Sequence, residues 1–141
     1  EAPRYVSWSR QNRSQLVRIP MVKGDNCRME LRSPDPACNP YLAIGLVLAA
    51  GLDGIEHRMV LQPPVNKNLF RPGEAEGLGL EMLPATLEEA VAIAEESDFL
   101  HKVLPEELSR RYFAEERARC EALRAAADPA EYERIHYFNA I

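Results

Sequence analysis

The chain has 141 residues, of which 46% are hydrophobic and 28% are charged. This is about the length of one domain, and the composition is that of a folded protein rather than a disordered chain. The net charge of −5 argues against a general nucleic-acid-binding surface, and the longest apolar run, Tyr41–Leu52, is well short of the roughly 20 residues that span a bilayer.

The number of cysteines and the lack of a visible signal peptide predict a reducing, cytoplasmic compartment. The three cysteines, Cys27, Cys38 and Cys120, are odd in number and lack the spacing of a metal site, so we expect free thiols in a reducing compartment. No signal peptide is visible at the start of the chain. We therefore expect a cytoplasmic protein with neither a membrane nor a nucleic acid as partner.

Basic residues gather in the first 32 positions, which hold only three acids, Glu1, Asp25 and Glu30. A basic segment inside an acidic chain favours a local anion site over a general grip on a polyanion. The basic residues of this segment are Arg4, Arg10, Arg13, Arg18, Lys23, Arg28 and Arg32.

Two β-prone stretches, 15–21 and 28–32, predict an antiparallel hairpin joined by a loop over 22–26. Charged and apolar residues alternate along the second stretch, so its charges share one face. If Met21 lies opposite Cys27, Arg18 faces Glu30. Before the hairpin, residues 5–8 are a candidate strand, and the polar segment 11–14 predicts a turn that places Arg13 at a strand end.

The segment after the hairpin predicts a helix. Asn39 is a good N-cap and Pro40 is suited to the first helical position. Residues 41–52 are apolar nearly all round, which predicts a buried helix that Asp53 and Gly54 would end.

The rest of the chain predicts a long surface loop and then a helical region. Prolines and glycines without a sustained period mark the loop over 56–85. Helices should follow from the capping box of Thr86 and Glu89, from Pro105, and from Asp128, the last ending in an apolar segment with Tyr137, Phe138 and Ile141. The whole chain, 1–141, thus predicts one α+β unit, in which an antiparallel hairpin packs with the buried helix and the C-terminal helices.

Two interpretations of the charged hairpin face remain open. Alternating charges are typical of a solvated outer strand face. Alternatively, the arginines form an anion site, because guanidinium forks suit phosphate and carboxylate ligands. A single carboxylate among several arginines would then serve as a ligand to Mg²⁺ or Mn²⁺, which share oxygen ligands with a bound phosphate.

Four segments resemble a known family, in order and at the family's spacing: NRSQLVRIP at 12–20, RMELRSPDPACNPYLA at 28–43, AGLDGI at 50–55 and NKNLF at 66–70. The chain is similar to the C-terminal part of the catalytic domain of class I, or bacterial-type, glutamine synthetase. The resemblance implies ATP-dependent ligation of glutamate and ammonia through γ-glutamyl phosphate. It also implies a divalent metal, Mg²⁺ or Mn²⁺, and a homo-oligomer, with a dodecamer expected.

The resemblance also implies roles for individual residues. Glu30 matches a glutamate that binds one of two divalent metals. Arg32 matches the arginine that contacts the transferred phosphoryl group and the substrate glutamate, and Arg13 matches a second arginine at that end. On the ATP side, Arg18 matches a nucleotide contact, Arg28 lies nearby, and Lys23 falls where relatives carry a basic residue.

The same resemblance places the other metal ligands and the ammonium site upstream of Glu1, so we expect a truncated C-terminal portion that is inactive alone. Phe70 takes the place of a tyrosine that some relatives adenylylate, and this regulation should be absent because phenylalanine has no hydroxyl. The C-terminal Tyr137 and Phe138 are expected to dock, either into a neighbouring subunit as in the family or within the chain. Two alternatives stay open: a ligase that joins glutamate to a larger amine, and a non-catalytic binding or assembly protein of this fold.

Overall fold

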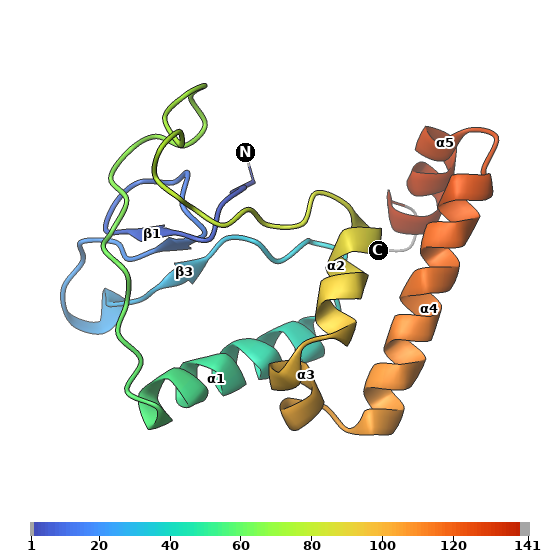
Figure 1. The fold of residues 1–141 in the computed structure, drawn as a ribbon, viewed down its shortest axis with the longest axis horizontal. Coiled ribbons are helices and arrows are strands. Elements are labelled where there is room, and N and C mark those ends of the chain that lie inside the picture. The colour runs from blue at the N-terminus through green and yellow to red at the C-terminus, as the bar shows by residue number, and fades with distance from the viewer. Residues whose placement is uncertain (1, 139–141) are drawn as a thin grey trace. The chain divides into compact units, whose positions relative to one another are not determined.

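The computed structural model describes residues 2–138, which form two compact units. The sheet unit comprises the chain up to Cys38 together with Gly51–Leu83. The helical unit comprises Asn39–Ala50 and the chain from Pro84 onward. The fold is mixed α+β, as the sequence predicts, with a small sheet and five α-helices among the described residues (Figure 1).

The sheet unit is built on three short strands, β1 (Trp8–Ser9), β2 (Val17–Arg18) and β3 (Glu30–Leu31), in the order β1-β2-β3. Strands β1 and β2 are parallel, whereas β2 and β3 are antiparallel with Arg18 opposite Glu30. The predicted hairpin and its register are therefore confirmed. The strands are shorter than predicted, because Pro20 has no N–H to continue the ladder.

The loop between β2 and β3 contains a single 3₁₀ turn, η1 (Gly24–Asn26). Gly24 has a φ of 65°, a left-handed conformation that glycine adopts without the steric cost of a side chain. The Cys27 N–H closes the turn by donating to the Gly24 carbonyl at 3.0 Å. This glycine allows the chain to reverse within the predicted five-residue connection.

Helix α1 (Pro40–Glu56) begins where the sequence predicts. The Asn39 Oδ1 accepts hydrogen bonds from the backbone N–H groups of Tyr41 and Leu42, at 3.0 and 3.3 Å. The predicted end at Asp53 and Gly54 is wrong. The helix continues to Glu56, and Arg58, with a φ of 49°, closes it in a Schellman motif with bonds from Met59 N to Gly54 O and from Arg58 N to Ile55 O.

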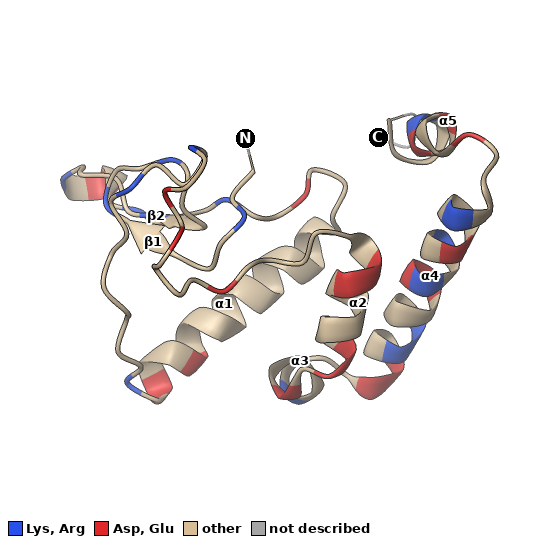
Figure 2. Ribbon diagram, turned by 45° about the horizontal axis from the view of Figure 1, so that its top comes forward, with Lys and Arg blue, Asp and Glu red and all other residues tan. Residues whose placement is uncertain are grey.

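Burial of α1 is a second correction, because the described structure buries none of its residues. An apolar stripe stays exposed along its length, from Tyr41 at 87% to Ile55 at 74%, with Leu48 at 63% between them. Few charged residues lie on this helix (Figure 2). The apolar pattern indicates that α1 needs cover on most sides, but it does not say that this chain provides the cover.

The structure describes no helix or regular strand after Glu56 and before Leu87, where the sequence predicts a long surface loop. Its last part returns to the N-terminal segment through an isolated antiparallel bridge between Tyr5 and Met82. Bonds of 2.8 Å from Val6 N to Glu81 O and from Leu83 N to Arg4 O flank this bridge.

The helical unit contains α2 (Leu87–Glu95), α3 (Asp98–Val103), α4 (Glu106–Ala125), α5 (Pro129–Glu133) and a π-helical turn, η2 (Arg134–Phe138). The predicted caps are present: Thr86 accepts from Glu89 N at 3.1 Å, and Asp128 accepts from Glu131 N at 3.1 Å. Ser97 caps α3, a helix that the sequence analysis did not predict.

Helices α2 and α4 pack on each other and bury Val91 and Phe113 (Figure 1). On α4, Arg119 Nη2 lies 2.5 Å from Glu115 Oε1, four residues earlier on the helix. At the C-terminal end, Phe138 is 77% exposed, so the described structure does not dock it within the chain. Ile141 lies outside the described residues.

Candidate functional site

The candidate site is centred on Glu30, which faces Arg18 across the β2–β3 pair. Arg18 Nη1 lies 2.8 Å from Glu30 Oε2, and Arg18 Nε donates to the Gln11 carbonyl at 3.1 Å. The side chains of Arg18 and Glu30 are only 20% and 28% exposed. The antiparallel register thus produces this ion pair directly, because side chains of opposed residues lie on the same face.

A second arginine reaches Glu30 from just before β3. Arg28 Nη2 lies 3.0 Å from Glu30 Oε1, Arg28 Nε lies 3.2 Å from the same oxygen, and Arg28 Nη1 donates to the Asn26 carbonyl. Arg28 lies two residues before Glu30, the spacing at which side chains of an extended chain share a face. We call Arg18, Arg28 and Glu30 the arginine bracket.

The bracket lowers the pKa of Glu30 from its ordinary value of 4.5. The hydrogen bond from Arg18 is the largest cause, Arg28 adds a smaller effect, and partial desolvation opposes both. Glu30 is therefore an ionised, oxygen-rich group at neutral pH. Among residues 2–138 no cluster of three or more His, Cys, Asp or Glu side chains is placed to hold a metal ion.

Arg32 is the first residue after β3, and its backbone N–H donates to the Leu16 carbonyl at 2.9 Å. Its Nη1 atom is buried and has no hydrogen-bond partner within the described chain. A buried guanidinium nitrogen without an acceptor is costly and is suited to an anionic oxygen. This fits the predicted contact with phosphate or carboxylate.

Arg13 is exposed, but the turn that carries it is held from both sides. Asn12 Oδ1 accepts from Ser14 N at 3.0 Å and from Ser14 Oγ at 2.9 Å. Asn12 Nδ2 in turn donates to the Lys67 carbonyl at 2.7 Å. The sequence predicts the turn but not this long-range anchor, for which the only sequence signal is that both segments are rich in polar residues.

Lys23, like Arg13, forms no ion pair with Glu30 among the described residues. It is exposed at the start of η1, and its side chain does not cap that turn. Within residues 2–138, Glu30 pairs with Arg18 and Arg28 and not with Lys23. The geometry therefore adds nothing to the prediction for Lys23.

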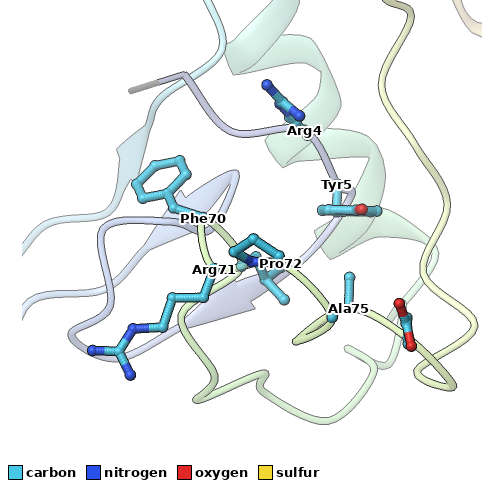
Figure 3. A pocket seen from close by; sticks show the side chains of 9 residues that line it. Arg4, Tyr5, Phe70, Arg71, Pro72 and Ala75 are labelled. Atoms are coloured by element: carbon cyan, nitrogen blue, oxygen red, sulfur yellow. The ribbon is translucent and has the colours of Figure 1, made fainter.

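A hollow of about 410 Å³ lies elsewhere in the sheet unit, and none of the predicted site residues lines it. Tyr5, Pro72 and Ala75 surround it, while the Arg71 side chain extends away from them (Figure 3). Phe70 also borders the hollow and is 38% exposed. The hollow is thus a surface feature of the N-terminal segment and the long loop, separate from the arginine bracket. Its lining residues are Arg4, Tyr5, Leu69, Phe70, Arg71, Pro72, Gly73, Ala75 and Glu76.

Comparison with known proteins gives one consistent family. Residues 1–135 match the model of the glutamine synthetase catalytic domain. The chain is 43% identical over 136 residues to a glutamine synthetase of Methanosarcina mazei, which covers 95% of this chain and 30% of that protein. A Methanocaldococcus jannaschii glutamine synthetase is 41% identical over 128 residues, 89% of this chain and 28% of its own. A Staphylococcus aureus glutamine synthetase is 37% identical over 139 residues, 97% of this chain and 31% of its own. The chain spans about 30% of the length of these curated relatives.

Proposed function

Because this chain belongs to the glutamine synthetase family, through the catalytic domain, we propose that it forms one wall of a site that activates glutamate with ATP. The complete polypeptide would be a glutamate–ammonia ligase that makes glutamine through γ-glutamyl phosphate. We also propose the class I type, the cytoplasmic location and the homo-oligomeric, dodecameric assembly on the strength of the resemblance. The chain described here would contribute arginines and one metal ligand.

The observation that carries the proposal is the arginine bracket next to Arg32. One ionised carboxylate lies between two guanidinium groups, and Arg32, two residues further along the chain, has a buried Nη1 that lacks an acceptor. A solvated strand face would not leave a guanidinium nitrogen buried and unpaired. A site that receives phosphate and carboxylate oxygens accounts for both features.

The proposed roles divide along the hairpin. Glu30 would hold the divalent metal, Mg²⁺ or Mn²⁺, which when bound neutralises phosphate oxygens. Arg18 and Arg28 would bind ATP phosphates. Arg18 uses Nε and Nη1 in the present contacts, so its Nη2 donors are available for a phosphate oxygen. Lys23 would lie on the same nucleotide side.

Arg32 and Arg13 would bind the transferred phosphoryl group and the substrate glutamate. Phosphoryl transfer demands little covalent chemistry of the protein, which positions the reactants and neutralises developing charge. Guanidinium groups serve both purposes because they keep their charge and offer two parallel donors. Since one carboxylate does not complete a metal site, we propose that the 141 residues alone form no glutamine.

The test replaces Glu30 in a polypeptide that contains this chain and has the length of the relatives. Glu30→Ala should weaken Mn²⁺ binding at least tenfold and abolish glutamate-dependent phosphate release from ATP, because a ligand and a bracket member are both lost. Mn²⁺ titration and a phosphate-release assay measure the two effects. Glu81→Gln, an exposed acid of the same unit, is the control. Near-normal turnover in Glu30→Ala would show that this wall does not serve the reaction.

A further inference from the structure

The most deeply buried side chains of the described structure are polar, and they lie beside Arg13. Gln15, Ser9 and Ser14 are the largest side chains that are essentially fully buried, with exposures of 0%, 0% and 1%. A buried amide or hydroxyl destabilises a fold unless its hydrogen bonds are made. The hydrogen bonds of these buried side chains therefore show which chain segments they hold together.

The side-chain amide of Gln15 both accepts and donates hydrogen bonds. Its Oε1 accepts from Ser7 Oγ at 2.5 Å, and its Nε2 donates to Ser14 Oγ at 3.2 Å and to the Lys67 carbonyl at 2.9 Å. Satisfied buried polar networks specify one arrangement of the segments that they join. The segments joined here are 52 residues apart in the chain.

The Lys67 segment is held at several points. The Lys67 carbonyl accepts from both Gln15 Nε2 and Asn12 Nδ2, and the Leu69 N–H donates to Ser14 Oγ at 2.9 Å. We call this set, Asn12, Ser14 and Gln15 with the backbone of Lys67 and Leu69, the polar clasp. Arg13 lies between Asn12 and Ser14, two members of the polar clasp.

The exposed side chain of Arg13 contrasts with its anchored backbone. The residues on either side, Asn12 and Ser14, bond both to each other and to the 67–69 backbone. The clasp therefore sets the point from which the Arg13 guanidinium extends. A misplacement of about 1 Å at a substrate-binding group can cost roughly a hundredfold in rate.

We propose that Gln15 is a positioning residue: through the polar clasp it holds the Arg13 turn against the 66–70 segment and so determines where Arg13 meets glutamate. This inference rests on the proposed function, because the role of Arg13 comes from there. Gln15 itself is buried and touches no substrate. Its effect should fall on glutamate, and not on ATP, which the proposal gives to Arg18 and Arg28.

The experiment uses Gln15→Leu in the longer polypeptide, with Gln62→Leu as a matched control at an exposed glutamine. Gln15→Leu keeps the volume and removes the bonds to Ser7, Ser14 and Lys67. We expect kcat/KM for glutamate to fall about 10- to 100-fold while KM for ATP stays within twofold. Hydrogen exchange of the Leu69 amide should become faster, and the Gln62→Leu protein should match the parent in all three.

A double substitution tests whether Gln15 acts through Arg13. If it does, Gln15→Leu should cost much less in an Arg13→Lys background than in the parent, since the contact it positions is already impaired. Full additivity of the two losses would overturn the inference, as would an unchanged Leu69 exchange rate with unchanged kinetics. If Gln15→Leu does not fold, Ser14→Ala, which removes only the Ser14 hydroxyl and its bonds, must show the same glutamate-specific loss.

The failure of the two proposals can be distinguished. Unchanged glutamate kinetics in Arg13→Lys and Arg13→Ala would refute the proposed role of Arg13, whatever the exchange data show. Impaired kinetics in the Arg13 variants together with normal kinetics in Gln15→Leu and Ser14→Ala would refute only the positioning role of Gln15.

Discussion

Glu30 lies between two guanidinium groups that hold it ionised. Its position opposite Arg18 follows from the strand register, and Arg28 contacts it from two residues earlier in the chain, just before β3. The same geometry suits both a structural ion pair and a phosphate site. One measurement, on Glu30, tests the ion pair, and a second, on Arg32, tests the anion site.

The first measurement is the pH dependence of stability. Because the folded-state pKa of Glu30 is lowered, its contribution to stability is present above pH 4.5 and is lost as pH falls through the folded-state pKa. We expect Glu30→Gln to lower the thermal midpoint at pH 6 to 7, with a difference that shrinks below pH 4.5. Scanning calorimetry of both proteins across pH 3 to 7 measures it. A difference that grows on acidification would contradict the direction of the pKa shift.

The second measurement concerns the buried Nη1 of Arg32. Arg32→Met removes a polar group that lacks a partner while keeping a long apolar side chain. We expect the free energy of unfolding of the ligand-free protein to stay the same or to rise by about 1 kcal/mol. In a polypeptide of the relatives' length, glutamate-dependent phosphate release should nevertheless fall at least a hundredfold. Denaturant unfolding and the phosphate assay are compared, and a loss of about 3 kcal/mol or more would instead make Arg32 a structural residue.

Among the elements, the pair α2 and α4 shows how a stretch dominated by charge acquires a core. Charged residues are frequent along α4 (Figure 2), yet the helix buries Phe113 against its neighbours. Ion pairs between α2 and α4, Glu95 with Arg117 and Glu88 with Arg124, border this contact. Three of these four side chains are 63% to 66% exposed, and only Glu95, at 23%, is half-buried. Burial rather than charge should therefore dominate the stability of the pair.

Two phenylalanines of the helical unit test this expectation. Phe113 is 8% exposed and Phe138 is 77% exposed. Phe113→Ala should lower the free energy of unfolding by about 3 kcal/mol because it leaves a cavity, whereas Phe138→Ala should change it by less than about 0.5 kcal/mol. Urea unfolding of the 141-residue chain compares them. Equal effects would mean that the two rings are buried alike.

At the scale of the whole molecule, the exposed stripe of α1 agrees with the coverage of the relatives. The chain spans about 30% of their length, and α1 lacks buried residues in the described structure. A helix with apolar side chains over most of its surface is normally buried by other segments of the protein. We expect the remainder of a polypeptide of the relatives' length to supply that cover.

Leu48 tests this expectation in two contexts. In the 141-residue chain Leu48 is 63% exposed, so Leu48→Ser should change the free energy of unfolding by less than about 0.5 kcal/mol. In a polypeptide of the relatives' length the same change should cost about 2 to 4 kcal/mol, because it would remove a buried side chain. Unfolding of both proteins, each with Glu81→Gln as a surface control, measures the contrast. A small effect in both contexts would leave α1 without a covering segment.

Features that depend on only a few neighbouring residues could be predicted from the amino-acid sequence. Alternation and loop length predicted that Arg18 faces Glu30, and side-chain chemistry predicted the helix caps at Asn39, Thr86 and Asp128. These rules succeed because the interacting groups are close in the chain or are related by one hairpin.

The folded structure was needed to reveal the polar clasp, the exposure of α1 and, among the described residues, the unpaired Nη1 of Arg32. The clasp joins Gln15 to Lys67 across 52 residues, and no local pattern reports which backbone carbonyl a buried amide will meet. The periodicity of α1 predicts that it needs cover, but burial also depends on which other segments are present. The physical reason is common to all three. A local sequence pattern indicates whether a side chain favours burial or solvent, but its partners come from distant chain segments that only folding brings together.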